Sequence, residues 1–412
     1  MDLKKQQIIG PHNKVQVMFA RGLFDNWKLP IYFDFDQDMT INILHEAISK
    51  LYECGFIVVA MVSDLGSTNR KLQKQLEVCP SNPSFPYPSI PDGKVFVFCD
   101  VPHLIKLVRN HFIDQDFILA DGRYIDKTPL EKLVELQTQN HLKGLKTGWK
   151  LNSSILQVKG NERQCVKSAT KLLSRNVAQA ILWAGDSNLL GNCEYKLTAS
   201  FINLINSWFD ILNSSMKYGH HPGSNAYGVD LDVQNKILND VSNIIEGMVV
   251  KSHNTLQPFQ HGILLTNASI QGIFSYLKQN FNISYLITKR FNQDILETLR
   301  GMGCNFDNPI PLEFIYRLRK YILCKHSSTV FTLHTNCKED TTNKENIVTP
   351  SSLSTITTDE PEIVLTQCIF DAIIDDTSLN AELELEESIK VQKEGCLSIG
   401  RISKAGLIYL AG

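Results

Sequence analysis

The chain has 412 residues, 43% of them hydrophobic, and a formal net charge of −2. This length and composition exclude a disordered or fibrous protein and predict more than one globular core. The longest apolar stretches, Phe56–Val62 and Val95–Cys99, are much shorter than the roughly 18 residues of a membrane span, so no membrane partner is expected.

The first sixty residues predict a β-β-α-β order. Residues 15–35 hold two apolar segments rich in β-formers, which predicts two strands joined by a turn. Thr40 can cap a helix that has one apolar stripe, and Gly55 can end it. Phe56–Ser63 is a continuous apolar run of strand length, as expected for a strand buried on both faces, and it places Asp64 at the strand's end.

A short polar helix and another strand are expected next. Val78–Gly93 is rich in Pro and Ser and is expected to be irregular. Lys94–Cys99 predicts a second buried strand that ends in Asp100, and His103–Phe112 predicts a helix. This order of elements predicts an α/β fold with a mixed sheet over residues 1–114.

From about residue 115 to 258 the pattern changes to long helical periods with little convincing strand, which indicates a separate, mainly helical insertion. Helices are predicted over residues 130–136, 165–182, 195–216 and 233–249. The sheet domain is expected to resume at residues 259–325. There, one helix is predicted around Ile270, with Asn267 or Ser269 near its start, and another over Phe291–Leu299.

Residues 326–394 are predicted to be a disordered acidic linker, because a Thr-, Ser-, Asp- and Glu-rich composition with few aromatics buries too little surface to fold. Lys338–Glu394 carries 14 acidic and 4 basic residues, so the rest of the chain is mildly cationic. Such a balance permits nucleic-acid contact and is also common in ordinary enzymes. Residues 395–412 are expected to be a truncated C-terminal motif.

Three acidic residues could act together. Asp64 follows a buried strand, and Asp294 and Glu297 lie three apart on a predicted helix, so those two share a face. Carboxylates from a strand end and a late helix can meet at a sheet edge, where magnesium finds its preferred oxygen ligands. Two metal ions held in this way support phosphodiester cleavage and strand transfer. In the alternative interpretation, Asp64 caps a turn and the helical pair lies on a solvated face.

Other common site motifs are missing from the sequence. The ten cysteines form no Cys-x-x-Cys pair and no Cys/His cluster at metal-ligand spacing, so reduced thiols are expected rather than a zinc site. The sequence also contains neither a Walker A motif nor Asn-Lys-x-Asp, which disfavours a general GTPase.

Several long segments are distinctive. They are FIVVAMVSDLGSTNRKL at 56–72, KVFVFCDVPHLIKLVRNHFID at 94–114, LITKRFNQDILE at 286–297 and FIYRLRKYIL at 314–323. Together with Trp208, Phe209 and Asp210 in the predicted insertion, they resemble, in the same order, segments of P-element-type transposases and their THAP-domain relatives. The resemblance extends through most of residues 15–325.

The resemblance implies a ribonuclease H-like fold, with residues 1–114 and 259–325 as its two parts and a GTP-binding insertion at 115–258. It implies magnesium-dependent DNA cleavage and strand transfer, with Asp64 and Glu297 as catalytic metal ligands. The implied partners are transposon-end DNA, bound through its backbone, and a guanine nucleotide. A homo-oligomer is left open, and the implied localisation is nuclear.

For the nucleotide, the resemblance places Lys150 and Ser174 at contacting positions, and Asp210 and Asn213 near the base. Asp294 matches an acidic residue close to both the nucleotide and the metals. A carboxylate is chemically suited to the base, because it can accept hydrogen bonds from guanine N1 and N2. Without the resemblance, these side chains would be interpreted as ordinary helix surface.

Departures from the family pattern leave two functions open. The family's first catalytic aspartate lies on a strand that would precede Met1, and Asp34 and Asp36 belong to the following strand region, so an incomplete triad is expected. The chain is therefore either a transposase with impaired catalysis or a domesticated, non-catalytic DNA- and guanine-nucleotide-binding protein. Salt-sensitive contacts to the DNA backbone are expected from basic side chains. These are Lys106, Arg109, Arg317, Arg319 and Lys320.

Overall fold

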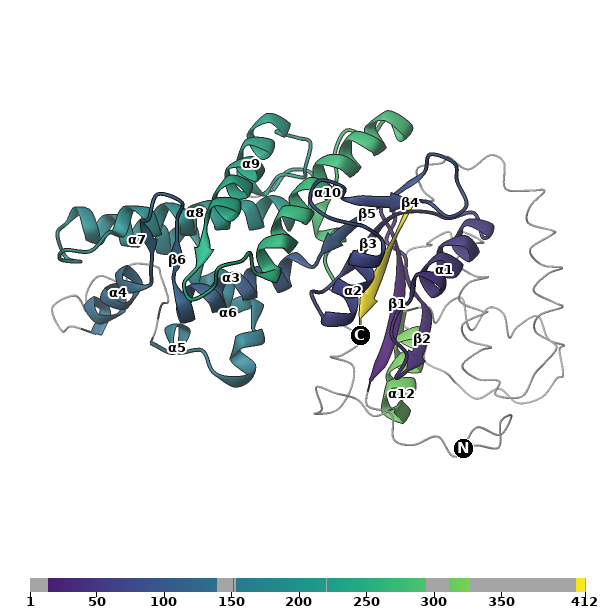
Figure 1. Ribbon diagram of the computed structural model, residues 1–412, viewed down its shortest axis with the longest axis horizontal. Coiled ribbons are helices and arrows are strands. Elements are labelled where there is room, and N and C mark those ends of the chain that lie inside the picture. Colours follow the sequence, from purple (N-terminus) through teal and green to yellow (C-terminus); the bar gives the residue numbers. More distant parts are fainter. Residues whose placement is uncertain are drawn as a thin grey trace, which may run out of the picture. The chain divides into compact units, whose positions relative to one another are not determined.

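A computed structural model describes residues 14–138, 151, 153–219, 221–293, 311–325 and 405–411 (Figure 1). The chain divides into two compact units. One comprises Met1–Val58 and Asp294–Gly412, and the other comprises Val59–Gln293. None of the described helices is long and apolar enough to cross a membrane.

The first unit is built on an antiparallel ladder. Its described elements are β1 (Val15–Gly22), β2 (Lys28–Phe35), α1 (Ile41–Glu53), α12 (Pro311–Lys325) and β9 (Ala405–Ala411). β1 pairs antiparallel with β2 along one edge and with β9 along the other. Helix α12 packs on one face of this ladder, where the ring of Tyr321 meets Phe19 edge-on at 5.6 Å and Phe314 lies 5.5 Å from Phe33.

The predictions for β1, β2 and α1 are confirmed, but the pairing of β9 was not predicted. Thr40 caps α1 by accepting a hydrogen bond from the backbone N of Ile43 at 3.3 Å. Gly55 follows the helix with φ of 86°, a conformation that favours glycine. The apolar character of residues 405–411 gave no indication of which strand they would pair with.

Two parallel strands, which lie in the second unit except for Ile57 and Val58, carry the predicted strand-end aspartates. β3 (Ile57–Ser63) pairs in parallel with β5 (Lys94–Cys99), and Ser63 lies opposite Cys99. Both strands are almost wholly buried, which explains their continuous apolar sequences. β4 (Ser84–Pro86) adds antiparallel to β5, inside the stretch that was expected to be irregular. A strand of three residues is too short to show a periodic pattern.

Two helices flank the ends of these strands, and a third packs on β5. They are α2 (Ser67–Gln75), α3 (Val101–Gln115) and α10 (Pro258–Phe281). The prediction that α10 starts near Asn267 or Ser269 is wrong, because Gln257 and Gln260 form a capping box at its first turn. The polar residues in its middle are buried and bonded instead. For example, Ser269 donates to the carbonyl oxygen of Val97 in β5.

The rest of the second unit is mainly helical. Its elements are β6 (Phe117–Ile118), β7 (Tyr124–Ile125), α4 (Thr128–Thr138), α5 (Ser153–Leu156), α6 (Val166–Leu172), α7 (Arg175–Asp186), α8 (Tyr195–Leu212), α9 (Leu231–Gly247), β8 (Val249–Val250) and the 3-10 helices η2 (Gly160–Gln164), η3 (Pro222–Ser224) and η4 (Thr288–Phe291). Helix α8 packs against α7 and α9 (Figure 1). The fully buried Trp208 of α8 donates from Nε1 to Oδ1 of Asn267 in α10 at 2.8 Å.

Two details of this region correct the sequence-based expectation. The helix predicted over residues 165–182 is two helices, because the chain breaks at Leu173 and Ser174 caps a new helix. A small sheet in the order β7-β6-β8 was missed. Each of its strands has only two residues, so no alternation of apolar and polar residues could be detected.

Candidate functional site

Asp64 lies directly after β3, and its carboxylate is held on one side. Its Oδ1 accepts hydrogen bonds from the backbone N of Gly66 and from Nδ2 of Asn69, both at 2.8 Å. Within the described part of the chain, Oδ2 accepts no hydrogen bond. The half-buried carboxylate therefore has one oriented oxygen and one oxygen available to a cation, which fits a hard ion such as magnesium.

Asp100 occupies the matching place at the end of β5. Its backbone N donates to the carbonyl oxygen of Ser63 at 2.9 Å, so the two aspartates follow neighbouring strands. Its Oδ2 accepts from the backbone N of His103 at 3.0 Å, which caps α3 and explains why that helix starts before the predicted His103. Its Oδ1 accepts from the backbone N of Gln293 at 2.8 Å.

Gln293 directly precedes the predicted carboxylates. Asp294 and Glu297 lie outside the described residues, and so does Lys150. The helix predicted from Phe291 does not begin there, because the 3-10 helix η4 ends at this residue and the next two residues are not helical. Among the described residues, no three His, Cys, Asp or Glu side chains form a group that could hold a metal ion.

Asp210, in the last turn of α8, is held in a different environment. Its Oδ2 accepts from Nδ2 of Asn206 at 2.7 Å and lies 3.8 Å from Nε2 of His221. Burial raises the pKa of Asp210, and the charges of His221 and Arg175 and the bond from Asn206 act in the opposite direction. In the described part of the chain Oδ1 accepts no hydrogen bond, so a partly desolvated oxygen is available to an N–H donor.

Asn206 links the start of α7, where Ser174 lies, to Asp210. The Oγ of Ser174 accepts from the backbone N of Val177 at 3.4 Å and so caps α7. The next residue, Arg175, donates its backbone N to Oδ1 of Asn206 at 3.1 Å. A single amide thus ties the start of α7 to the carboxylate of Asp210. Sequence reasoning missed Asn206, although its place four residues before Asp210 on a helix was a usable signal.

Asn213 connects α8 to the segment that leads to Gln293. Its Oδ1 accepts from Nδ2 of Asn292 at 2.8 Å. Asn292 is fully buried, and its own Oδ1 has no hydrogen-bond partner among the described residues. Since Gln293 is bonded to Asp100, the two adjacent residues 292 and 293 link the candidate nucleotide site to the strand ends that carry Asp64 and Asp100. No sequence pattern indicated this link.

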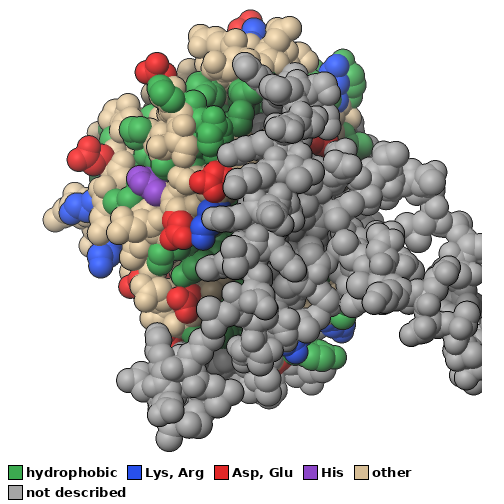
Figure 2. Space-filling view, turned by 90° about the vertical axis from the view of Figure 1, so that its right-hand side faces the viewer, with side chains coloured by type: hydrophobic (Ala, Val, Ile, Leu, Met, Phe, Trp, Pro, Cys, Tyr) green, Lys and Arg blue, Asp and Glu red, His purple; other side chains and the backbone are tan. Residues whose placement is uncertain are grey.

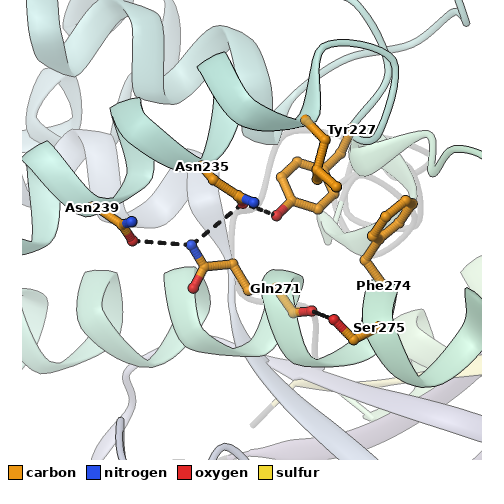
Figure 3. A pocket seen from close by; sticks show the side chains of 7 residues that line it. Tyr227, Asn235, Asn239, Gln271, Phe274 and Ser275 are labelled. Atoms are coloured by element: carbon orange, nitrogen blue, oxygen red, sulfur yellow. Dashed lines mark hydrogen bonds between the residues drawn. The ribbon is translucent and has the colours of Figure 1, made fainter.

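A pocket of about 280 Å³ lies between α9 and α10, away from the predicted site residues (Figure 3). It is lined by Tyr227, Leu231, Asn235, Asn239, Gln271, Phe274 and Ser275. The amide of Gln271 donates to Oδ1 of Asn239 at 3.1 Å and to Oδ1 of Asn235 at 3.5 Å, and the hydroxyl of Tyr227 also bonds Asn235. These polar groups bond to one another, so the network joins two helices and is interpreted as structural.

The expectation that all five basic residues contact DNA is wrong for three of them. Arg109 is fully buried and donates to the carbonyl oxygens of Glu162 and Arg163. Arg317 is buried against Glu313, and Lys106 is also buried. Two side chains remain exposed, those of Arg319 and Lys320. Figure 2 shows acidic and basic side chains interspersed among apolar ones on the described part of one face, without a continuous basic patch there.

Family models match two parts of the chain. The model described as TNP-like, GTP-binding insertion domain matches residues 102–225, and the model described as TNP-like, RNase H N-terminal domain matches residues 3–77. The first match overlaps the predicted insertion and contains Ser174, Asp210 and Asn213. The second contains Asp64.

Two curated proteins and one solved structure are similar to the chain. The Transposable element P transposase of Drosophila melanogaster is 39% identical over 320 residues, which cover 76% of this chain and 42% of that protein. DNA transposase THAP9 of Homo sapiens is 27% identical over 307 residues, which cover 69% of this chain and 33% of that protein. The chain thus spans less than half the length of these relatives. The Drosophila P element transposase strand transfer complex matches with 38% identity and a TM-score of 0.71, over 77% of this chain and 72% of that chain.

Proposed function

Since the chain belongs to the P-element-type transposase family, with its ribonuclease H-like α/β fold and GTP-binding insertion, we propose that it carries a metal-dependent DNA cleavage and strand-transfer core. The observation that carries the proposal is the carboxylate of Asp64, which follows a central parallel strand and keeps one oxygen available. A strand-end carboxylate of this kind is what a magnesium-dependent phosphoryl transfer needs.

Asp64 and Glu297 are the proposed metal ligands. Gln293 is bonded to Asp100 at the end of β5, the neighbour of the strand that carries Asp64. Four residues span at most about 14 Å when fully extended, so the covalent chain alone keeps Glu297 within that reach of Gln293. Bound magnesium would polarise the phosphodiester and activate the attacking hydroxyl. Asn69 and Gly66 would orient the Asp64 carboxylate through their hydrogen bonds to Oδ1.

The proposed cofactor is GTP, held by the insertion. The open Oδ1 of Asp210 can accept from guanine N1 and N2, and Asn213 lies one helical turn further along the chain. Lys150 and Ser174 are proposed contacts of the nucleotide, and Asp294 is proposed to act near the nucleotide and the metals. Adenine has no N–H donor at N1, so a site of this kind discriminates against ATP.

The proposed substrate is DNA, contacted through its backbone at transposon ends, and the proposed location is the nucleus. The exposed Arg319 and Lys320 can supply sequence-independent attraction to phosphates. A non-catalytic, domesticated DNA- and nucleotide-binding protein is the second candidate.

A manganese titration of the 412-residue chain, followed by electron paramagnetic resonance, tests the proposal. Manganese accepts the same oxygen ligands as magnesium and is directly visible. We expect both Asp64→Asn and Glu297→Gln to weaken binding about tenfold or more. Asp121→Asn serves as a matched control, because Asp121 is an exposed partner of Arg123. Binding that neither site variant weakens would contradict the proposed function.

A further inference from the structure

The amide of Asn213, at the end of α8, is engaged on one side only. Its Oδ1 accepts from Nδ2 of Asn292 at 2.8 Å, whereas its Nδ2 makes no hydrogen bond within the described part of the chain. Asn213 is half-buried and follows Asp210 by three residues, a spacing that places two side chains on one face of a helix. The last turn of α8 therefore offers both an acceptor, Oδ1 of Asp210, and a donor, Nδ2 of Asn213.

This pair of groups complements guanine rather than adenine. The pairing edge of guanine has N–H donors at N1 and N2 next to the acceptor O6, whereas adenine has an acceptor at N1 next to the donor at N6. Asp210 can accept from the two donors of guanine, and an N–H of Asn213 can donate to O6. With its amide turned over, Asn213 would direct Oδ1 at O6, and the two oxygens would repel each other. The orientation of this amide decides whether it supports guanine recognition or opposes it.

We infer that Asn292 is a positioning residue, which holds Asn213 by its oxygen and thereby presents the Nδ2 donor of Asn213 to O6 of a guanine nucleotide. This inference rests on the proposed function, because it assigns the last turn of α8 to the nucleotide site. Asn292 is fully buried, so water does not compete for its bond to Asn213.

The segment that carries Asn292 is itself fixed to the end of α8. Oγ1 of Thr288 accepts from the backbone N of Ser214 at 3.0 Å, and the backbone N of Lys289 donates to the carbonyl oxygen of Ser214 at the same distance. The side chains of Thr288 and Ser214 are both buried and bond to each other at 2.8 Å. The backbone N of Asn292 then donates to the carbonyl oxygen of Lys289 at 3.2 Å. Asn292 is thus held in a defined place beside Asn213.

The contribution of Asn292 to stability does not account for its presence. Its buried Oδ1 has no hydrogen-bond partner among the described residues, and a buried acceptor without a partner destabilises the folded state. Leucine has a similar volume and no polar atom to leave unbonded. Asn292→Leu should therefore fold about as stably as the unmodified chain, while Asn213 loses the group that holds its oxygen.

The test compares the affinities of the full chain for GTP and for 6-thio-GTP, measured by calorimetry. The analogue keeps the donors at N1 and N2 but has sulfur, a weak acceptor, in place of O6. We expect the unmodified chain to prefer GTP roughly three- to tenfold, as for one hydrogen bond between neutral groups. Asn213→Ala, which removes the donor, should lower this preference to about twofold or less. Asn292→Leu should do the same, because a freely turning amide loses its conformational freedom on binding and gains little.

Asn235→Leu is the matched control for a general loss of stability. Asn235 is a half-buried amide between α9 and α10, where it accepts from the hydroxyl of Tyr227 and from Gln271. Its loss should lower the melting temperature and leave the preference for GTP over 6-thio-GTP unchanged. A merely structural role of Asn292 would likewise lower the affinities for both nucleotides equally, so an unchanged ratio in Asn292→Leu would overturn the inference.

The outcomes separate this inference from the proposed function. If Asp210→Ala weakens GTP binding but Asn292→Leu keeps the preference of the unmodified chain, or the unmodified chain shows no preference, this inference alone is overturned. If Asp210→Ala binds GTP as tightly as the unmodified chain, the proposed nucleotide site fails and this inference fails with it.

A second measurement needs no substitution of Asn292. With isotope-labelled asparagine amides, nuclear magnetic resonance of the unmodified chain reports on the Nδ2 protons of Asn213, whose signals are identified by their absence in Asn213→Ala. We expect one of these protons to shift downfield on saturation with GTP and to shift less with 6-thio-GTP. Signals of Asn213 that do not move with GTP, or move equally with both nucleotides, would overturn the inference even if Asn292→Leu fails to fold.

Discussion

The end of β3 and the last turn of α8 each present one carboxylate, in contrasting surroundings. Oδ1 of Asp64 accepts from two neutral N–H donors, and its second oxygen accepts no hydrogen bond within the described part of the chain. Asp210 is also half-buried, its pKa is raised by burial, and the side chains of His221 and Arg175 act on it from nearby. Desolvation strengthens a hydrogen bond from a neutral donor, whereas a carboxylate with one oriented oxygen and one unbonded oxygen suits a hard cation. Similar side chains thus suit different ligands.

The largest effect is expected from a substitution of Asp210, which should weaken the recognition of guanine. Asp210→Ala removes the acceptor for two N–H donors, and each hydrogen bond to a charged group contributes about 1.5–3 kcal/mol. We expect GTP affinity to fall about 100-fold or more, measured by calorimetry. Asp64→Ala should weaken manganese binding and change GTP affinity by less than about twofold. A variant of Asp210 that still prefers GTP to ATP would contradict this assignment.

The pH dependence of the nucleotide site should follow from the raised pKa of Asp210. Guanine donors favour the carboxylate, so GTP affinity should be constant above this pKa and fall up to about tenfold per pH unit below it. The dependence of folding stability on pH has the opposite sign. A raised pKa in the native state favours the protonated form, so this group's contribution to stability is present at low pH and is lost as pH rises through the native pKa. Asp210→Asn should abolish both trends in titrations and in thermal denaturation at several pH values.

Much of the fold could be predicted because its signals are local. The apolar runs of β3 and β5 and the cap and stop of α1 each depend on neighbouring residues only. The start of α10 was misplaced because Asn267 and Ser269 are buried polar residues that bond to other elements, a pattern that imitates a helix end in sequence. The place of β9 depends on a partner almost 400 residues away, about which local patterns carry no information.

The candidate site was only partly predictable for the same reason. Asp64 follows a buried strand, so its place could be inferred locally. The link from Asn213 through Asn292 to Asp100 joins residues that are distant in sequence, and no spacing rule reports it. The burial of Arg109 also depends on tertiary contacts, because a basic residue on a helix is normally solvated.

A smaller effect is expected from loosening the Asp64 carboxylate without removing it. Asn69→Ala deletes one of the two donors to Oδ1, and loss of a hydrogen bond that orients a metal-binding carboxylate corresponds to about a tenfold decrease in manganese affinity. Asn239→Ala, in the pocket between α9 and α10, is the matched control and should leave the affinity unchanged. An equal decrease in both variants would indicate a general loss of stability rather than a role at Asp64.

The smallest effect is expected at Ser174, where two roles overlap. Ser174→Ala removes the cap of α7 and should lower the free energy of unfolding by about 1 kcal/mol. Ser174→Asp keeps a capping oxygen, so stability should be retained, but a carboxylate beside a nucleotide phosphate should lower GTP affinity about threefold by like-charge repulsion. Denaturant unfolding and nucleotide titration of the two variants separate these roles. If Ser174→Asp binds GTP as tightly as the unmodified chain, Ser174 caps α7 and does not contact the nucleotide, and recognition by the insertion depends on Asp210 and Asn213.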